Sequence, residues 1–304
     1  MIDVAVMIEG QDGLNWPRWQ AIARATEEAG FAGLFRSDHF SNPRGPWKDA
    51  LELWSSLTWV ASHTQCIEFG PLVSPVSFRH PVITAWQAAC VDDLSDGRLR
   101  LGLGAGWQER EHTAFGYELL TLKERFDRFE EGLEVVTRLL RSDEPVSFEG
   151  KYYRLNDALL TPRPKRRDLP ITIGGKGPRR TLPLVAKYAA EWNTPNMPLE
   201  EYKELNARLN RLLRKAGRER SSLRRSMMTS VVFGRDEAEL KRKIGDNSVD
   251  TMRARGRIVG TAPQIAEQLR ALAAAGLDRV MLRWEDLEDA AGLRAFGEAV
   301  LGLL

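Results

Sequence analysis

Short β-branched apolar runs alternate with longer amphipathic stretches from one end of the chain to the other. The first run, residues 3–8, contains almost only apolar residues, which is typical of a parallel strand buried on both faces. Similar runs predict about eight strands, and most of them can be placed directly. These runs span residues 3–8, 32–37, 67–73, 99–104, 171–175, 230–234 and 278–283.

The stretches between these runs carry apolar residues at helical spacing. The clearest amphipathic pattern covers residues 123–141, where apolar side chains recur from Phe126 to Leu140. Further helices are predicted over residues 16–30, 49–61, 82–94 and 263–275, and a last helix closes the chain.

The regular order of strand and helix predicts an α/β fold with a parallel sheet. No Gly/Ser-rich or Pro-rich linker divides the chain, and no internal repeat is evident. A (β/α)8 TIM barrel that forms a single domain over residues 1–304 is therefore favoured. An open doubly wound sheet is the alternative. In a barrel, the chemistry is expected where the strands end, at the C-terminal face.

Composition narrows the classes of function. The 44 Lys and Arg residues nearly balance the 42 Asp and Glu residues, for a formal charge of +2, so neither nucleic acid nor membrane partners are expected. No basic leader precedes residues 3–8, and no apolar run approaches the roughly 18 residues of a membrane span. Cys66 and Cys90 do not form a disulfide framework, and no Cys or His spacing suits a metal. We expect a soluble, cytoplasmic protein without a catalytic metal.

Asp38 and His39 directly follow the second predicted strand. A carboxylate and an imidazole at this position can project into the mouth of a barrel, and histidine titrates near neutral pH. A histidine that only caps the next segment is the alternative. Glu9, at the end of the first strand, is a further candidate for substrate contact.

Two glycine-rich strand ends are candidates for ligand binding. In residues 102–107, GLGAGW, alternate glycines allow a flat ligand or a phosphate to approach the backbone, although the spacing differs from the dinucleotide fingerprint. In residues 173–181, Gly174 and Gly175 precede a helix predicted to start at Pro178, with basic side chains nearby. Those side chains are Lys176, Arg179 and Arg180. A helix N-terminus with this composition favours phosphate binding over a plain turn.

The basic run over residues 208–225 is interpreted as a solvated helix face rather than a nucleic-acid site.

Several ordered segments together resemble the luciferase-like monooxygenase superfamily. They include LFRSDHF, the long segment from IEFGPLVSP to LGLGAGWQEREHTAFGYE, PVSFEGKYYRL and ITIGGKGPRRTLPLVAKYAAEWN. The SDHF and GLGAGW segments are similar to the branch that uses coenzyme F420, a deazaflavin that carries hydride. The resemblance implies a barrel with an insertion segment. It also implies an oxidoreductase that transfers hydride between F420 and an unidentified small organic substrate.

The resemblance also implies roles for individual residues. Asp38 and His39 would lie beside the cofactor ring, with His39 as the proton donor or the polar partner at the hydride-transfer centre. A non-prolyl cis peptide is expected at about Pro71–Leu72, with Ser74 facing the cofactor. Ala105 and Gly106 would approach the ring, and Gly174, Gly175 and Lys176 would hold the phosphate, joined by Arg179 from the basic loop.

One position departs from the family pattern. The deazaflavin sugar-phosphate dehydrogenases carry an acid after the third glycine, where this chain has Trp107. This difference favours a flatter or more apolar substrate stacked near Trp107 and Trp47. A pocket that selects the substrate by shape is expected between the barrel mouth and the insertion, somewhere in residues 141–165 or 234–260.

Two other functions remain compatible with the resemblance. One is an FMN-dependent monooxygenase of the same fold, supplied by a separate reductase. The other is a catalytically silent flavin-binding protein. Members of the superfamily are often dimers, so a homodimer is expected.

Overall fold

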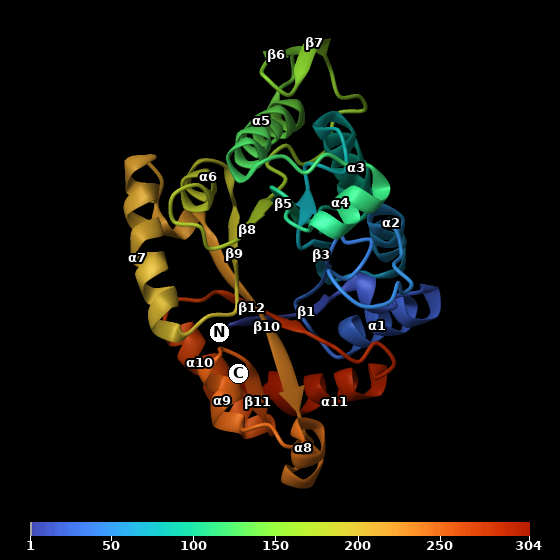
Figure 1. The fold of residues 1–304 in the computed structure, drawn as a ribbon, viewed down its shortest axis with the longest axis vertical. Helices are drawn as coiled ribbons and strands as arrows, with labels where there is room; N and C mark the ends of the chain where they lie inside the picture. Colours follow the sequence, from blue (N-terminus) through green and yellow to red (C-terminus); the bar gives the residue numbers. More distant parts are fainter. Residues whose placement is uncertain (1) are drawn as a thin grey trace.

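The computed structural model describes residues 2–304 and contains a nearly closed parallel barrel (Figure 1). The hydrogen-bonded order is β3-β2-β1-β12-β10-β9-β8-β5-β4, so the two ends of the path are consecutive in sequence. The barrel strands are β1 (Asp3–Ile8), β2 (Gly33–Arg36), β3 (Glu68–Pro71), β4 (Ser74–Pro75), β5 (Leu101–Gly104), β8 (Ile171–Gly174), β9 (Glu191–Pro195), β10 (Arg224–Phe233) and β12 (Arg279–Arg283). The short strand β11 (Ile258–Gly260) pairs with β10.

Contacts between strand β3 and the two residues before β5 close the barrel. The amide N–H of Arg100 donates to the Phe69 carbonyl over 2.8 Å, and Phe69 and Leu99 form a parallel bridge. If β3 and β4 are counted as one interrupted strand, the path has eight strand positions. The predicted (β/α)8 barrel is thus confirmed, and the open doubly wound sheet is excluded.

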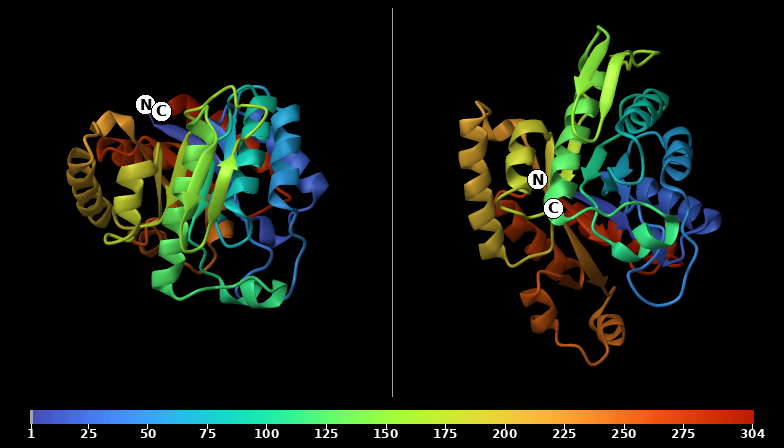
Figure 2. Two further views of the ribbon diagram at one scale, coloured as in Figure 1. Left: turned by 90° about the horizontal axis from the view of Figure 1, so that it is seen from above. Right: turned by 45° about the horizontal axis from the view of Figure 1, so that its top comes forward.

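Helices cover the outside of the barrel, as Figures 1 and 2 show. They are α1 (Trp16–Glu28), α2 (Leu53–His63), α3 (Pro81–Leu94), α4 (Glu109–Phe115), α5 (Leu122–Arg141), α6 (Thr181–Tyr188), α7 (Leu199–Lys215), α8 (Glu237–Ile244), α9 (Val249–Ala254), α10 (Ala262–Ala274) and α11 (Ala290–Val300). The amphipathic stripe predicted over residues 123–141 is confirmed, because α5 buries Phe129, Leu133, Val136 and Leu140.

An antiparallel hairpin interrupts the strand and helix order after α5. It consists of β6 (Val146–Glu149) and β7 (Arg154–Ala158), and it projects beyond the barrel body (Figures 1 and 2). This hairpin corresponds to the expected insertion.

The strand predictions are wrong in two places. The segment Glu191–Pro195 forms β9 although it was not predicted as a strand, because only one of its five residues, Thr194, is β-branched. The strand predicted over residues 230–234 begins earlier, at Arg224, and its first part buries the polar residues Arg225 and Ser226. The basic run over residues 208–225 is therefore not solvated throughout, since Arg225 is 1% exposed and donates to Asn206 and Asn210.

Charged residues fill the N-terminal end of the barrel. Glu68 at the start of β3 pairs with Arg279 at the start of β12 and also with Arg100 and Arg224. Nη1 of Arg279 lies 3.5 Å from Oε2 of Glu191, which is completely buried. Because parallel strands begin at the same end of a barrel, this cluster lies at the end opposite the expected site.

Among residues 2–304, no helix is both long enough and apolar enough to cross a membrane.

Candidate active site

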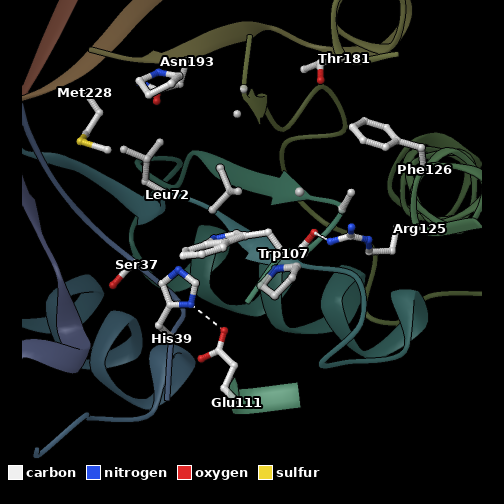
Figure 3. Close-up of a pocket in the computed structure, with 18 of the residues that line it drawn as sticks. Ser37, His39, Leu72, Trp107, Glu111, Arg125, Phe126, Thr181, Asn193 and Met228 are labelled. Atoms are coloured by element: carbon white, nitrogen blue, oxygen red, sulfur yellow. Dashed lines mark hydrogen bonds and ion pairs between the residues drawn. The ribbon is translucent and has the colours of Figure 1, made fainter. Parts of the chain in front are cut away.

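A cavity of about 610 Å³ opens at the C-terminal ends of the strands (Figure 3). Its wall includes Glu9 after β1, His39 after β2, and residues 104–107 at the end of β5. Residues at the ends of β8 and β9, Met228 in the middle of β10 and residues at the start of α5 line it as well. A pocket of this size can enclose most of a cofactor-sized molecule.

His39 lines the cavity and is held by a buried carboxylate. Its Nδ1 lies 2.7 Å from Oε1 of Glu111, and the other Glu111 oxygen accepts the Phe40 amide N–H over 2.8 Å. The His39 side chain is 18% exposed and that of Glu111 only 1%. Because an ionised carboxylate can only accept, Nδ1 carries the proton and Nε2 is left for the cavity.

The surroundings of His39 favour its charged form. Burial alone would lower the pKa of the imidazole, but the hydrogen bond and the negative charge of Glu111 outweigh it and raise the pKa above its usual 6.5. Glu9 and Asp38 contribute further negative charge. His39 can therefore exist as a proton donor near neutral pH and as a proton acceptor once it is deprotonated.

Replacing Glu111 by Gln is expected to lower the pKa of His39, because the amide removes the negative charge and leaves the burial in place. A neighbouring opposite charge typically shifts a pKa by about 1 to 3 units. NMR titration of the labelled imidazole would measure the change. The matched control is Glu109→Gln, an exposed acid on the same helix. An unchanged His39 pKa in Glu111→Gln would show that the pair does not control the protonation of His39.

The prediction that Asp38 and His39 project into the mouth together is wrong for Asp38. Asp38 is 3% exposed, and its carboxylate accepts the Ser74 hydroxyl over 2.7 Å and pairs with Arg79. Neither Asp38 nor Ser74 lines the cavity. Successive side chains on an extended segment point to opposite sides, so the two neighbours separate. Asp38 and Ser74 instead brace the loop that carries His39.

The non-prolyl cis peptide lies one bond later than expected, at Leu72–Val73 rather than Pro71–Leu72. Pro71 ends the buried strand β3, whereas Leu72 and Val73 line the cavity. One glycine of the GLGAGW segment, residues 102–107, has a role in packing rather than in ligand binding. A Cβ on Gly104 would lie 2.6 Å from a Val73 methyl group, so this glycine admits Val73 rather than a ligand.

The glycine-rich loop after β8 reaches the cavity, but its basic side chains do not. Gly174, Gly175 and Thr181 line the wall, and Gly175 has a φ of 121°, which favours glycine. Helix α6 starts at Thr181, three residues after the predicted Pro178. The side chain of Lys176 pairs instead with Glu201 at 2.8 Å, and Arg179 is exposed outside the cavity wall.

Among the described residues that line the cavity, Arg125 is the one with a permanent positive charge. One guanidinium nitrogen donates to the Gly106 carbonyl over 3.0 Å, while the buried Nε lacks a partner among the described residues. The guanidinium therefore brings a fixed positive charge to the cavity wall, which favours an anionic group of a ligand.

The remaining predicted residues divide between the cavity and the surface. Glu9, Ala105, Gly106 and Trp107 line the wall. Trp47 does not, and it is 53% exposed beneath the Arg110 guanidinium, 4.6 Å from its ring centre.

The substrate pocket expected between the barrel mouth and the insertion is not part of this cavity. Neither residues 141–165 nor residues 234–260 contribute to this cavity. Leu122, Arg125 and Phe126, at the start of α5, occupy its outer wall instead. The β6–β7 hairpin projects away from the barrel (Figure 2), and none of its residues lines the cavity.

Sequence reasoning missed Glu111 and Arg125. Both follow β5 in sequence, as Trp107 does. Their position after a strand end was therefore the signal in the sequence that could have identified them as site residues. It was ambiguous, because the intervening segment contains several charged residues and only the fold shows which face inward. His112 also lines the cavity, but both ring nitrogens are occupied, by the Gln108 carbonyl at 2.6 Å and the Ser77 hydroxyl at 2.8 Å.

The wall fits a flat heterocycle with an anionic substituent. Leu72, Val73, Ala105, Phe126 and Met228 provide apolar surface suited to a ring. The positive charge of Arg125 and the glycine loop before α6 favour an anion. The residues present are thus compatible with a phosphorylated deazaflavin or flavin.

The sequence of this chain is similar to those of known flavin and deazaflavin proteins. The model of the luciferase-like monooxygenase family matches residues 4–255. An F420-dependent glucose-6-phosphate dehydrogenase from Kineococcus radiotolerans is 31% identical over 226 residues, which cover 70% of this chain and 63% of the relative. An F420-dependent hydroxymycolic acid dehydrogenase from Mycobacterium tuberculosis is 30% identical over 275 residues, 88% of this chain and 71% of the relative.

Among solved structures, an F420-dependent secondary alcohol dehydrogenase in complex with an F420-acetone adduct has a TM-score of 0.85. It is 19% identical and covers 100% of this chain and 99% of its own. This likeness establishes the fold. The chain spans less than two thirds of the length of the relative from Kineococcus.

Proposed function

Because this chain belongs to the luciferase-like monooxygenase family, we propose that it is an oxidoreductase that transfers hydride between coenzyme F420 and a small organic substrate. The observation that carries the proposal is the buried Glu111–His39 pair, which places a titratable imidazole in the wall of an apolar cavity. The F420 dependence of both curated relatives supports the choice of cofactor.

When bound, the deazaflavin supplies the hydride chemistry. The chain supplies the proton. Nε2 of His39 accepts a proton from a substrate hydroxyl during oxidation, or returns it to a carbonyl oxygen during reduction. Glu111 stabilises the resulting imidazolium and keeps Nδ1 as the donor, so that Nε2 remains at the cavity. Trp107 contacts the imidazole edge-on, with ring centres 5.6 Å apart.

Titration with both cofactors tests the proposal. Addition of protein should quench deazaflavin fluorescence in a saturable way, and reduced FMN should produce no comparable response. Tight binding of reduced FMN with oxygen consumption would instead support a monooxygenase that depends on a separate reductase. Binding of F420 without turnover on a broad panel of acceptors would support a catalytically silent flavin-binding protein.

Removing the cation at Arg125 is expected to weaken F420 binding. Replacement by Met should raise the dissociation constant by roughly 10- to 100-fold, since a hydrogen bond to a charged group contributes about 1.5 to 3 kcal/mol. The double replacement Lys176→Ala with Arg179→Ala should cost about 1 to 3 kcal/mol if the anionic tail reaches these side chains. Fluorescence titration measures both effects.

Arg211→Met, on the exposed face of α7, is the control for the general loss of positive charge. A dissociation constant that is unchanged in both the Arg125 variant and the double variant would place the anionic tail elsewhere.

We also propose a homodimer, as members of the family often form. Helix α3 exposes the apolar residues Ile83, Trp86 and Leu94, which an interface between two copies would cover. Sedimentation of the purified protein tests this proposal.

A further inference from the structure

The segment that follows His39 is held by side chains rather than by a helix or a sheet. Within residues 2–304, residues 40–48 form no hydrogen bond between two backbone groups, and residues 43–49 are exposed. A loop of this kind is mobile unless other groups bind its backbone. Contacts from outside the segment therefore decide where the His39 imidazole lies.

Helix α4 supplies two of these contacts close to the imidazole. The Glu111 carboxylate binds Nδ1 of His39 over 2.7 Å (Figure 3), and it accepts the Phe40 amide N–H over 2.8 Å. Gln108, at the N-cap position of the helix, donates from Nε2 to the Ser41 carbonyl over 2.8 Å. These contacts align the imidazole with its carboxylate as long as this part of the backbone stays against α4.

Arg110 holds the part of the segment that these contacts do not reach. Nη1 of its guanidinium donates to the Asn42 carbonyl over 3.0 Å and to the Gly45 carbonyl over 2.9 Å. The guanidinium carbon also lies 4.6 Å from the ring centre of Trp47, within the range of a cation–π contact. One side chain of α4 therefore fixes three positions of an otherwise exposed stretch.

We infer, on the basis of the proposed function, that Arg110 is a positioning residue for the reaction. It clamps residues 42–47 onto α4 and thereby keeps the His39 imidazole against the Glu111 carboxylate. Hydrogen bonds from a charged donor are stronger than those from a neutral one, so a guanidinium suits this role. Arg110 is not among the described residues that line the cavity, so it acts through His39 rather than on a ligand.

The pKa of His39 distinguishes this positioning from a general effect of charge. If the Arg110 cation acted only through its field, its removal would raise the pKa of the imidazole. If Arg110 positions the pair, its removal loosens the contact with Glu111 and lowers the pKa of His39 instead. The other charged or titratable groups around the imidazole stay in place in either case. These groups are Glu9, Asp38, His112 and Arg125.

Arg110→Met tests the inference in the protein without cofactor. NMR titration should give a His39 pKa that is lower by about 1 unit, the low end of the effect of a neighbouring opposite charge. The Phe40 amide should exchange its hydrogen faster with solvent. Arg110→Lys should restore most of both properties, because one ammonium can donate to two carbonyls as Nη1 does.

Turnover provides a second measurement. With F420 and a member of the acceptor panel that the unmodified protein reduces, kcat in Arg110→Met should fall about 10- to 100-fold, as for a small misplacement of a catalytic group. The dissociation constant of F420 should stay nearly unchanged. Trp47→Leu removes the cation–π contact and leaves both carbonyl bonds, so its effects should have the same direction and be smaller.

Arg44→Met is the matched control, because Arg44 is an exposed arginine of the same segment. It should leave the His39 pKa and the Phe40 exchange rate unchanged. An unchanged or higher His39 pKa in Arg110→Met would overturn the inference and leave the proposed function intact. A lower pKa in a protein that turns over no member of the panel would overturn the proposed function and leave only the clamp.

Discussion

Replacing His39 by Ala is expected to reduce kcat about 100- to 10,000-fold, the range over which a positioned acid or base contributes to catalysis. The imidazole is the titratable ring that the cavity offers for proton transfer, since both nitrogens of His112 are occupied. The substitution does not change the residues that are proposed to hold the anionic tail of F420. F420 should therefore still bind with nearly the original dissociation constant, and the loss should appear in kcat.

Two comparisons separate a chemical role of His39 from a structural one. His63→Ala, at an exposed histidine near the end of α2, should leave kcat unchanged. Added imidazole should partly restore turnover in His39→Ala, because the vacated space adjoins the cavity. If turnover persists at the original level in His39→Ala, the proton comes from another group and the proposed mechanism is wrong.

The sequence predicts the barrel because its hydrophobic pattern is regular. Apolar runs such as residues 3–8 and the stripe over residues 123–141 depend on local spacing, and the structure preserves both. Strand β9 is not predicted from the sequence, because its composition does not favour a strand. It forms a strand by pairing with β8 and β10. Local sequence patterns identify helices and strands whose residues strongly favour that conformation. They do not identify a segment that becomes a strand because its neighbours pair with it.

The sequence predicts which strand ends form the candidate site. It does not predict which side chains at those strand ends point into the cavity. His39 lies in the cavity as expected, whereas the adjacent Asp38 turns to Arg79 because extended residues alternate. Glu111, four residues after Trp107, provides the carboxylate that contacts His39. Its contact with His39 spans 72 residues in sequence, so only the folded chain reveals it.

Arg279→Met is expected to destabilise the protein by roughly 3 to 5 kcal/mol, the usual consequence of leaving one buried charge without its partner. Arg279 is 1% exposed, and its guanidinium pairs with Glu68 and approaches the completely buried Glu191. Methionine fills the volume but supplies no charge. Urea unfolding would show the loss as a lower midpoint. Arg224→Met, at a cluster residue that is 31% exposed, should cost about 1 kcal/mol or less.

The same cluster predicts how stability depends on pH. Burial alone would raise the pKa of Glu68, but Arg100 and Arg279 outweigh it and lower the pKa from 4.5 to about 2. Glu68 therefore stabilises the fold above pH 4.5, and this contribution is lost as the pH falls toward 2. In Arg279→Met the Glu68 pKa should move back toward its ordinary value, so acid unfolding should begin at a higher pH than in the unmodified protein.

A second replacement tests whether the buried charge causes the loss. Adding Glu191→Gln to Arg279→Met removes the carboxylate that the first change leaves unpaired, so part of the lost stability should return. If the double variant is no more stable than Arg279→Met, the loss arises from packing against Phe35, whose ring centre lies 5.5 Å from the guanidinium carbon. Because the cluster lies at the end of the barrel opposite the cavity, F420 binding should survive in every variant that folds.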